Sequence, residues 1–186
     1  MKFDVLNRFT GDVQFTAEIK TDSTSKSFQL GLAVRWAIKN NADLRNADLR
    51  NADLRNADLR NADLRNADLR NADLRNAALS DANLWNADLR SADLRNADLW
   101  NANLWNASGN LKYIKTMQID GWPISYTAVD MQIGCQRHPI EKWERFRDLT
   151  IDRMDTRALA WWKIWKPIIF QIIETSPAEP TGKEKS

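Results

Sequence analysis

The sequence predicts a mainly β protein in which a short coil of strands is closed at each end by a small module. Three observations predict this fold. Residues 41–107 repeat a five-residue unit, residues 1–40 show strand-like alternation and then helical periodicity, and residues 108–174 combine short apolar runs with two helical patterns. We therefore divide the chain into an N-terminal cap, a repeat array and a C-terminal α+β module. The polar residues 175–186 are predicted to be a disordered tail.

Composition and charge exclude several classes of protein. The chain has 186 residues with 27 basic and 25 acidic side chains, and its formal net charge is only +2. This balance lacks the basic excess of a nucleic-acid-binding protein and the acidic excess of a DNA mimic. The single cysteine, Cys135, excludes an intramolecular disulfide, and the N-terminus has no apolar stretch of signal-peptide length. The apolar residues 161–173 are too few to span a bilayer, so we expect a cytoplasmic protein without a membrane partner.

The repeat array places thirteen leucines five residues apart, from Leu44 to Leu104, each preceded two positions earlier by an alanine. On an α-helix, five residues advance the azimuth by about 140° net, so the leucines would form no stripe. On a continuous strand, an odd period would turn every second leucine toward water. A turn within each repeat resolves this. Ala-Asp-Leu then forms a short strand with its aspartate outward, and Arg-Asn forms the corner, where asparagine tolerates the left-handed conformation.

From Ala42 to Ala107 the sequence resembles the pentapeptide-repeat family, whose motif A(D/N)LXX it matches almost letter for letter. The resemblance implies a right-handed, quadrilateral β-helix with four pentapeptides per coil, leucine at the centre of each side and alanine toward the axis. Thirteen repeats would then make a little over three coils, or a rod about 15 Å long at the usual strand spacing of about 4.8 Å. Open coil ends would expose unpaired backbone and leucine, so each end needs a cap.

The N-terminal forty residues predict such a cap. Residues 3–9 and 13–19 alternate in hydropathy around Thr10-Gly11-Asp12, which is typical of a β-hairpin. Residues 28–38 then show apolar positions at helical spacing, and this helix runs directly into the first repeat. Its N-cap candidates are Ser23, Thr24 and Ser25.

The C-terminal module is predicted to contain strands followed by helices. Residues 113–119, 122–129 and 131–135 have the character of short strands, with a turn at Asp120-Gly121. A helix begins at Pro139 and carries apolar residues as far as Leu149. A second helix shows one apolar face, formed by Leu159, Trp162, Trp165, Ile169 and Ile172, with Pro167 as the position of a kink.

The two ends of the chain, including NRFTGDVQFTAEI and WWKIWKPIIFQIIE, resemble pentapeptide proteins of phages and prophages. We therefore expect a phage-type binding protein that acts in a bacterial host. It would inhibit or modulate a nucleic-acid-handling or defence complex of the CRISPR or topoisomerase class, and its partner would be a host protein or ribonucleoprotein. The resemblance also implies that some relatives bind DNA gyrase as strongly acidic duplex mimics, a pattern from which these arginine-rich repeats depart.

The side chains outside the coil suggest two interpretations. If residues twenty apart stack, the arginines form columns beside columns of aspartate. The columns could be a solvated, self-neutralised surface, which we favour, or a face that recognises phosphates or carboxylates. Tryptophans that interrupt them could be an exposed hot spot or, as we prefer, pack beneath the C-terminal module. The candidate binding residues are Arg50, Arg70, Arg90, Arg55, Arg75, Arg95, Trp85, Trp100 and Trp105.

The sequence offers few candidate catalytic residues. Cys135 and His138 have a CxxH spacing, but His138 is the only histidine, and a metal site needs further ligands. No nucleophile, base and orienting group can be assembled without it, and the glycines form no phosphate-binding loop. Cys135 is expected to be a small core residue. We therefore expect a protein that is not an enzyme and uses neither cofactor nor metal.

Two alternative functions remain open. The arginine columns could bind nucleic acid directly, with an affinity that falls steeply as salt rises. Alternatively, the protein could be a structural or assembly module. Under either hypothesis we expect a homodimer formed through the C-terminal helix, because residues 158–174 carry more apolar surface than one coil end can cover. The dimerisation candidates are Trp161, Trp165, Ile168 and Ile172.

Overall fold

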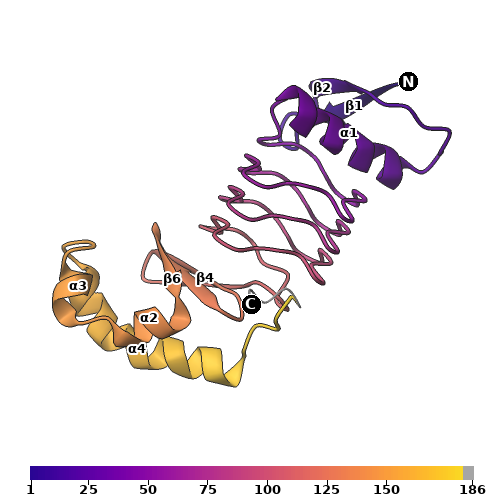
Figure 1. The fold of residues 1–186 in the computed structure, drawn as a ribbon. Helices are drawn as coiled ribbons and strands as arrows, with labels where there is room; N and C mark the ends of the chain where they lie inside the picture. The colour runs from indigo at the N-terminus through magenta and orange to yellow at the C-terminus, as the bar shows by residue number, and fades with distance from the viewer. Residues whose placement is uncertain (182–186) are drawn as a thin grey trace.

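The computed structural model describes residues 1–181 and shows a stack of coils with a different module at each end. In Figure 1 a hairpin and helix α1 lie at one end of the coils, and a small sheet with helices α2, α3 and α4 lies at the other. No helix between residues 1 and 181 combines the length and apolar character that crossing a membrane requires.

The coils are held together by hydrogen bonds between residues about twenty apart. The Leu49 N–H donates to the Asp68 carbonyl at 2.8 Å, and the Asp68 N–H donates to the Ala47 carbonyl at 2.9 Å. Parallel bridges such as Asp48 with Asp68, and Asp68 with Asp88, continue the pattern. One coil therefore contains four pentapeptides, and the predicted β-helix is confirmed.

Every fifth residue makes a corner in the left-handed region. The φ angle is 60° at Asn46 and 55° at Asn106, with similar values at the corners between them. Asparagine tolerates this conformation because its short polar side chain hydrogen-bonds locally. Two corners carry another residue, Asp81 at φ 61° and Ser91 at φ 60°. The repeat thus turns once every five residues, as the sequence predicted.

Leucine and alanine side chains fill the interior of the coils. Every repeat leucine from Leu49 to Leu94 is fully buried, with an exposed fraction of 0%. Exposure rises at the last complete coil, where Leu99 reaches 8%. Because all of these positions face inward, the hydrophobic stabilisation of the array grows with each stacked coil.

The N-terminal cap consists of β1 (Lys2–Leu6), β2 (Val13–Glu18) and α1 (Lys26–Asn40). The antiparallel strands are shorter than predicted because residues 7–11 form the turn, in which the Gly11 N–H donates to the Asn7 carbonyl. Ser25 caps α1 by accepting from the Phe28 N–H. The helix lies so close to the first coil that a Cβ on Gly31 would stand 2.0 Å from the Asp53 carbonyl oxygen.

The C-terminal module contains a four-stranded antiparallel sheet in the order β3-β4-β5-β6. Its strands are β3 (Lys115–Ile119), β4 (Trp122–Tyr126), β5 (Asp130–Ile133) and β6 (Gln136–Pro139). Its helices are α2 (Ile140–Arg145), α3 (Asp148–Asp152) and α4 (Ala158–Thr175). The last helix includes Pro167, as predicted.

Three features of this module differ from the prediction. Strand β6 was missed because its residues, QRHP, show no apolar alternation. The helix expected from Pro139 through Leu149 is instead two short helices, and Leu149 is 72% exposed. Cys135 is exposed, not a core residue, because it follows Gly134 in the turn between β5 and β6, where the φ angle of Gly134 is 55°.

Buried polar groups join this module to the last coil. The Ser125 hydroxyl donates to the Leu104 carbonyl at 2.8 Å, and the Leu104 N–H donates to Gln132 Oε1 at 3.0 Å. Both polar side chains are nearly inaccessible, at 3% and 5% exposed. They replace hydrogen bonds that a further coil would have made, so the open end of the coil is capped as expected.

The segment after α4 is another difference, because the sequence predicted disorder over residues 175–186. Thr175 belongs to α4, and residues 176–181 pack against the protein. The Tyr126 hydroxyl donates to the Ser176 carbonyl at 2.9 Å, and Ala178 is only 6% exposed. Polar composition alone did not reveal these contacts. Residues 182–186 of the predicted tail lie outside the described part of the chain.

Candidate interaction surface

Each arginine of the repeat array is paired with the aspartate two residues before it. Arg50 donates from Nε to Asp48 Oδ1 at 2.8 Å and from Nη2 to Oδ2 at 2.6 Å. Asp48 Oδ1 also accepts from the Arg50 backbone N–H at 3.3 Å. The pairing is local, because the aspartate points outward from the strand and the arginine follows at the corner. It occurs at Arg45, Arg50, Arg55, Arg60, Arg65, Arg70, Arg75, Arg90 and Arg95.

Stacking links the pairs from coil to coil. Arg50 Nε lies 3.8 Å from Asp68 of the next coil, and Arg70 Nε lies 3.6 Å from Asp88 of the coil after that. Asp68 is 2% exposed and Asp88 is 5% exposed, so these carboxylates are enclosed by the arginines and their neighbours. The result is a column in which opposite charges alternate, which offsets the repulsion between like charges stacked along the rod.

Charge pairing also lowers the pKa of aspartates such as Asp48 and Asp58. The hydrogen bonds from Arg60 lower the pKa of Asp58 to about 2, and those from Arg50 lower the pKa of Asp48. The arginines respond in the opposite direction, since the hydrogen bond with Asp48 raises the pKa of Arg50. All of these groups are therefore charged at neutral pH.

The predicted arginine sites are thus brought together, but in neutralised form. Arg50, Arg70 and Arg90 follow one side of the rod, and Arg55, Arg75 and Arg95 follow the next. Two of the nitrogens on each guanidinium already face a carboxylate. This geometry favours the self-neutralised surface over a free phosphate-binding face.

The predicted tryptophans lie in two places. Trp85 and Trp105 contact each other, with ring centroids 6.1 Å apart and planes at 60°, in the column that begins with Arg45 and Arg65. Trp105 remains 36% exposed. Trp100 lines a separate cleft of about 450 Å³ together with Val129 and other residues of the C-terminal module. Trp100 therefore lies beside the C-terminal module, as we preferred, but it remains partly exposed. Trp85 and Trp105 instead contact each other on the rod.

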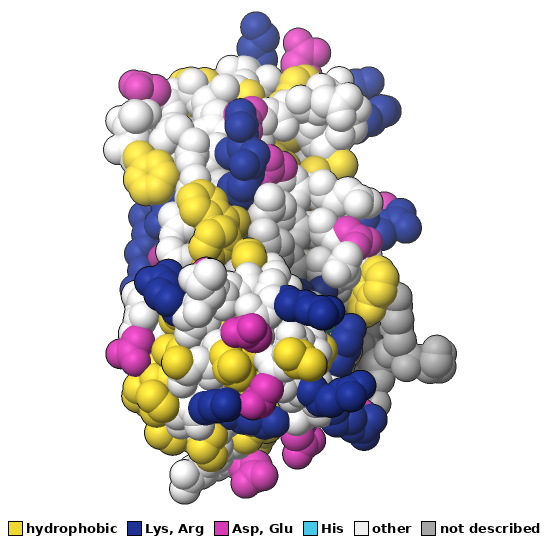
Figure 2. Space-filling view, turned by 90° about the vertical axis from the view of Figure 1, so that its left-hand side faces the viewer, with side chains coloured by type: hydrophobic (Ala, Val, Ile, Leu, Met, Phe, Trp, Pro, Cys, Tyr) yellow, Lys and Arg dark blue, Asp and Glu magenta, His cyan; other side chains and the backbone are white. Residues whose placement is uncertain are grey.

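The local sequence changes where the tryptophan pair occurs. Asn83 and Asn103 stand at the positions that carry aspartate in the other repeats of this column, so both members of the charge pair are replaced. An asparagine ladder runs along the adjacent corner: Asn66 Nδ2 donates to Asn46 Oδ1 at 2.9 Å, and Asn86 Nδ2 donates to Asn66 Oδ1 at 2.8 Å. The tryptophan pair thus stands where neither member of the Asp–Arg pair is present. Figure 2 shows one face of the molecule, on which hydrophobic side chains lie among scattered charges of both signs.

Arg8 is a residue of this region that the sequence did not indicate. It extends from the hairpin turn and donates from Nη1 to the carbonyls of Asn66 and Ala67, both at 3.1 Å. Its Nη2 lies 3.9 Å from Asp88. A single arginine near the end of a predicted strand carries no signal for a contact 58 residues away. Arg8 fixes the cap to the second coil.

Cys135 and His138 do not form a reactive pair with a third group. The His138 ring packs edge-on against Trp143 and Phe146, with centroids 5.4 and 4.9 Å away, and burial lowers its pKa. The exposed Cys135 Sγ accepts instead from Gln136 Nε2 at 3.8 Å. Among residues 1–181, no three histidine, cysteine or acidic side chains are grouped so that they could hold a metal ion.

Two of the four proposed dimerisation residues, Trp161 and Trp165, make contacts within the single chain. Trp165 Nε1 donates to Asp120 Oδ2 at 2.9 Å, and Trp161 packs on Trp122 with centroids 5.9 Å apart. Ile172 is half-buried, but Ile168 is 40% exposed. With Ile164, which is 63% exposed, Ile168 leaves an apolar strip along the outside of α4.

Comparisons with known proteins agree with the geometry of the coils. Residues 40–76 and 72–108 match the family Pentapeptide repeats (8 copies). These residues of the chain therefore belong to the pentapeptide-repeat family. Among proteins with curated descriptions, none matches this chain significantly.

Solved structures of three pentapeptide repeat proteins are similar to parts of the chain. One, from the thylakoid lumen of Arabidopsis thaliana, is 36% identical over 37% of this chain, with a TM-score of 0.36. Rfr23 from the cyanobacterium Cyanothece 51142 is 39% identical over 33%, with a TM-score of 0.27. HetL from Nostoc sp. strain PCC 7120, involved in heterocyst differentiation regulation, is 34% identical over 34%, with a TM-score of 0.23. The matches span 48%, 45% and 37% of those proteins.

Proposed function

We propose that this chain is a non-catalytic binding protein that presents its β-helix, as a rigid right-handed quadrilateral rod, to a protein partner. The observation that carries the proposal is the Trp85–Trp105 pair, which stands where two Asp–Arg pairs are replaced. Tryptophan is enriched at the centres of protein interfaces, where it contributes a large apolar area. A pre-organised rod also loses little conformational entropy on association.

The charge arrangement supports a protein partner over nucleic acid. Residues 41–107 contain nine arginines and eleven aspartates, so 9 − 11 leaves the array a formal charge of −2. Every one of these arginines is paired with its own aspartate. A phosphate would have to displace a bidentate carboxylate at each contact, which removes most of the favourable electrostatic term in nucleic-acid binding.

In its specific form, the proposal is a phage-type inhibitor or modulator in the cytoplasm of a bacterial host. Its partner would be a nucleic-acid-handling or defence complex, of the CRISPR or topoisomerase class. The resemblance of both chain ends to phage and prophage proteins supports this choice. Neither a cofactor nor a metal takes part in the proposed activity.

The test is quantitative affinity capture from bacterial lysate with three forms of the protein. Wild type and Arg60→Ala should enrich the same partner, whereas the double variant Trp85→Ala, Trp105→Ala should lose it. Arg60 is the matched control, because it is an exposed rod residue outside the tryptophan pair. Equal capture by the folded double variant would contradict the proposal. Binding of labelled duplex or single-stranded DNA at low salt, with a steep decline as salt rises, would favour the nucleic-acid alternative.

A second candidate is an assembly module that dimerises through α4. The exposed strip of Ile164 and Ile168 favours it, because apolar surface of this kind often contacts a second copy. Light scattering at micromolar concentration would show twice the 21.5 kDa of one chain, and Ile168→Asp would return the mass to one chain. A wild-type mass of one chain would exclude the dimer.

A further inference from the structure

A small aromatic cavity lies inside the C-terminal module, away from the rod surface considered above. It has a volume of about 70 Å³ and lies between the sheet and helices α3 and α4. Four tryptophans line it: Trp122, Trp143, Trp161 and Trp162. A cavity that holds one water molecule needs a volume of only about 10–15 Å³, so this cavity is large enough for a small organic group.

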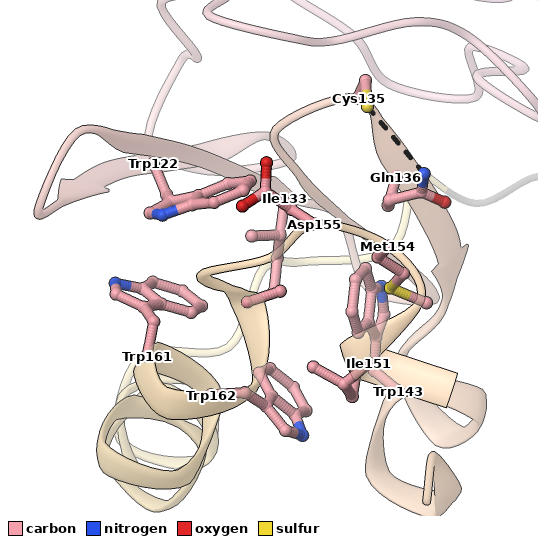
Figure 3. Close-up of a pocket in the computed structure, with 11 residues that line it drawn as sticks. Trp122, Ile133, Cys135, Gln136, Trp143, Ile151, Met154, Asp155, Trp161 and Trp162 are labelled. Carbon is pink, nitrogen blue, oxygen red and sulfur yellow. Dashed lines mark hydrogen bonds between the residues drawn. The ribbon is translucent and has the colours of Figure 1, made fainter. Parts of the chain in front are cut away.

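The tryptophans approach the cavity as two pairs. Trp122 and Trp161 have ring centroids 5.9 Å apart and planes at 40°, and Trp143 and Trp162 have centroids 5.3 Å apart and planes at 44°. In Figure 3, Trp122 and Trp161 lie on one side and Trp143 lies on the other, with Ile133 between them. The packing brings together β4, α2 and α4, so the arrangement depends on the tertiary fold.

One charged group faces this cavity. Asp155 is the only lining residue with a carboxylate, and Figure 3 shows that its side chain points toward Trp122. Its Oδ1 accepts from the Arg157 N–H at 2.8 Å and lies 3.7 Å from Arg157 Nε. The Arg157 side chain is 82% exposed, so water screens that charge. Oδ2 of Asp155 accepts no hydrogen bond from residues 1–181.

We propose that this cavity binds a methylated ammonium group, such as the head of choline or the side chain of a trimethylated lysine. Indole faces carry negative electrostatic potential and attract cations, and a carboxylate at the edge adds to that attraction. A primary ammonium needs several hydrogen-bond acceptors, whereas Asp155 supplies the only carboxylate here. Methyl groups need no acceptors and can pack against Ile133 and Met154, which also line the cavity. This inference does not rest on the proposed function.

Isothermal titration can separate charge from size. Choline and a peptide containing trimethyllysine are the two cationic probes, and 3,3-dimethylbutanol is the neutral probe with the same shape as choline. At least one cationic probe should bind saturably, at least tenfold more tightly than the neutral alcohol. Whichever cationic probe binds more tightly identifies the source of the group. Absence of saturable binding by both cations, or equal binding of the alcohol, would overturn the proposal.

Two aspartate variants locate the binding without disturbing the core. Asp155→Asn preserves the size of the side chain and should weaken binding of the cationic probe at least fivefold. Asp152→Asn is the matched control, because Asp152 is exposed on α3 and does not line the cavity. It should bind like wild type. Unchanged binding by Asp155→Asn would place the cation elsewhere and refute the assignment.

Discussion

Replacement of one core leucine tests the inward orientation on which the whole rod depends. In Leu74→Asn, a side chain with an exposed fraction of 0% becomes an amide with no partner in the leucine column. Loss of the leucine's apolar burial costs about 2 kcal/mol, and burial of an unpaired amide costs about 1–3 kcal/mol more. We expect the free energy of unfolding to fall by about 4 kcal/mol. For a chain of this size, that corresponds to a decrease in Tm of roughly 10 °C.

The same chemical change at Leu111 provides the control. Leu111 is 70% exposed, and its φ angle is 62°, a conformation that asparagine adopts more readily than leucine. Leu111→Asn should therefore leave Tm unchanged or raise it slightly. Both variants are measured by thermal unfolding followed by circular dichroism. An unchanged Tm for Leu74→Asn would refute the inward assignment of the leucines, whatever the control shows.

Three further predictions concern the corners, the cap and the charge pairs. Ser91→Asn should raise the free energy of unfolding by up to about 1 kcal/mol, because Ser91 stands at φ 60°; a lower Tm would contradict this. Gly31→Ala should loosen α1 from the first coil, because the new Cβ would lie 2.0 Å from the Asp53 carbonyl oxygen; faster hydrogen exchange confined to the cap would show it. Acid should weaken the charge pairs. The folded-state pKa of Asp58 is lowered to about 2 from 3.8, so its contribution to stability is complete above about pH 4 and is lost as pH falls toward 2. In denaturant titrations, the free energy of unfolding of Asp58→Asn should change less between pH 2 and pH 5 than that of wild type. Identical pH profiles of the two proteins would disprove the role of the pair.

The sequence alone was sufficient for the coil. A period of five is incompatible with both an α-helix and a continuous strand, so the turn in each repeat, the buried leucines and the left-handed asparagines all follow from local geometry. The hairpin and helix at the N-terminus could also be predicted, since each has its own periodicity. These features were accessible because their causes lie within a few residues of one another.

Only the tertiary structure decided the remaining features. The contact of Arg8 with the second coil and the exposure of Cys135 involve packing that no local pattern encodes. Strand β6 is polar and exists because β5 offers it hydrogen bonds. The cavity beside Asp155 likewise forms from a sheet and helices that meet only in the folded chain. The conformation of each repeat is set by residues that are neighbours in the chain. These contacts instead join segments far apart in the chain, and they depend on which surfaces remain exposed once the coils have stacked.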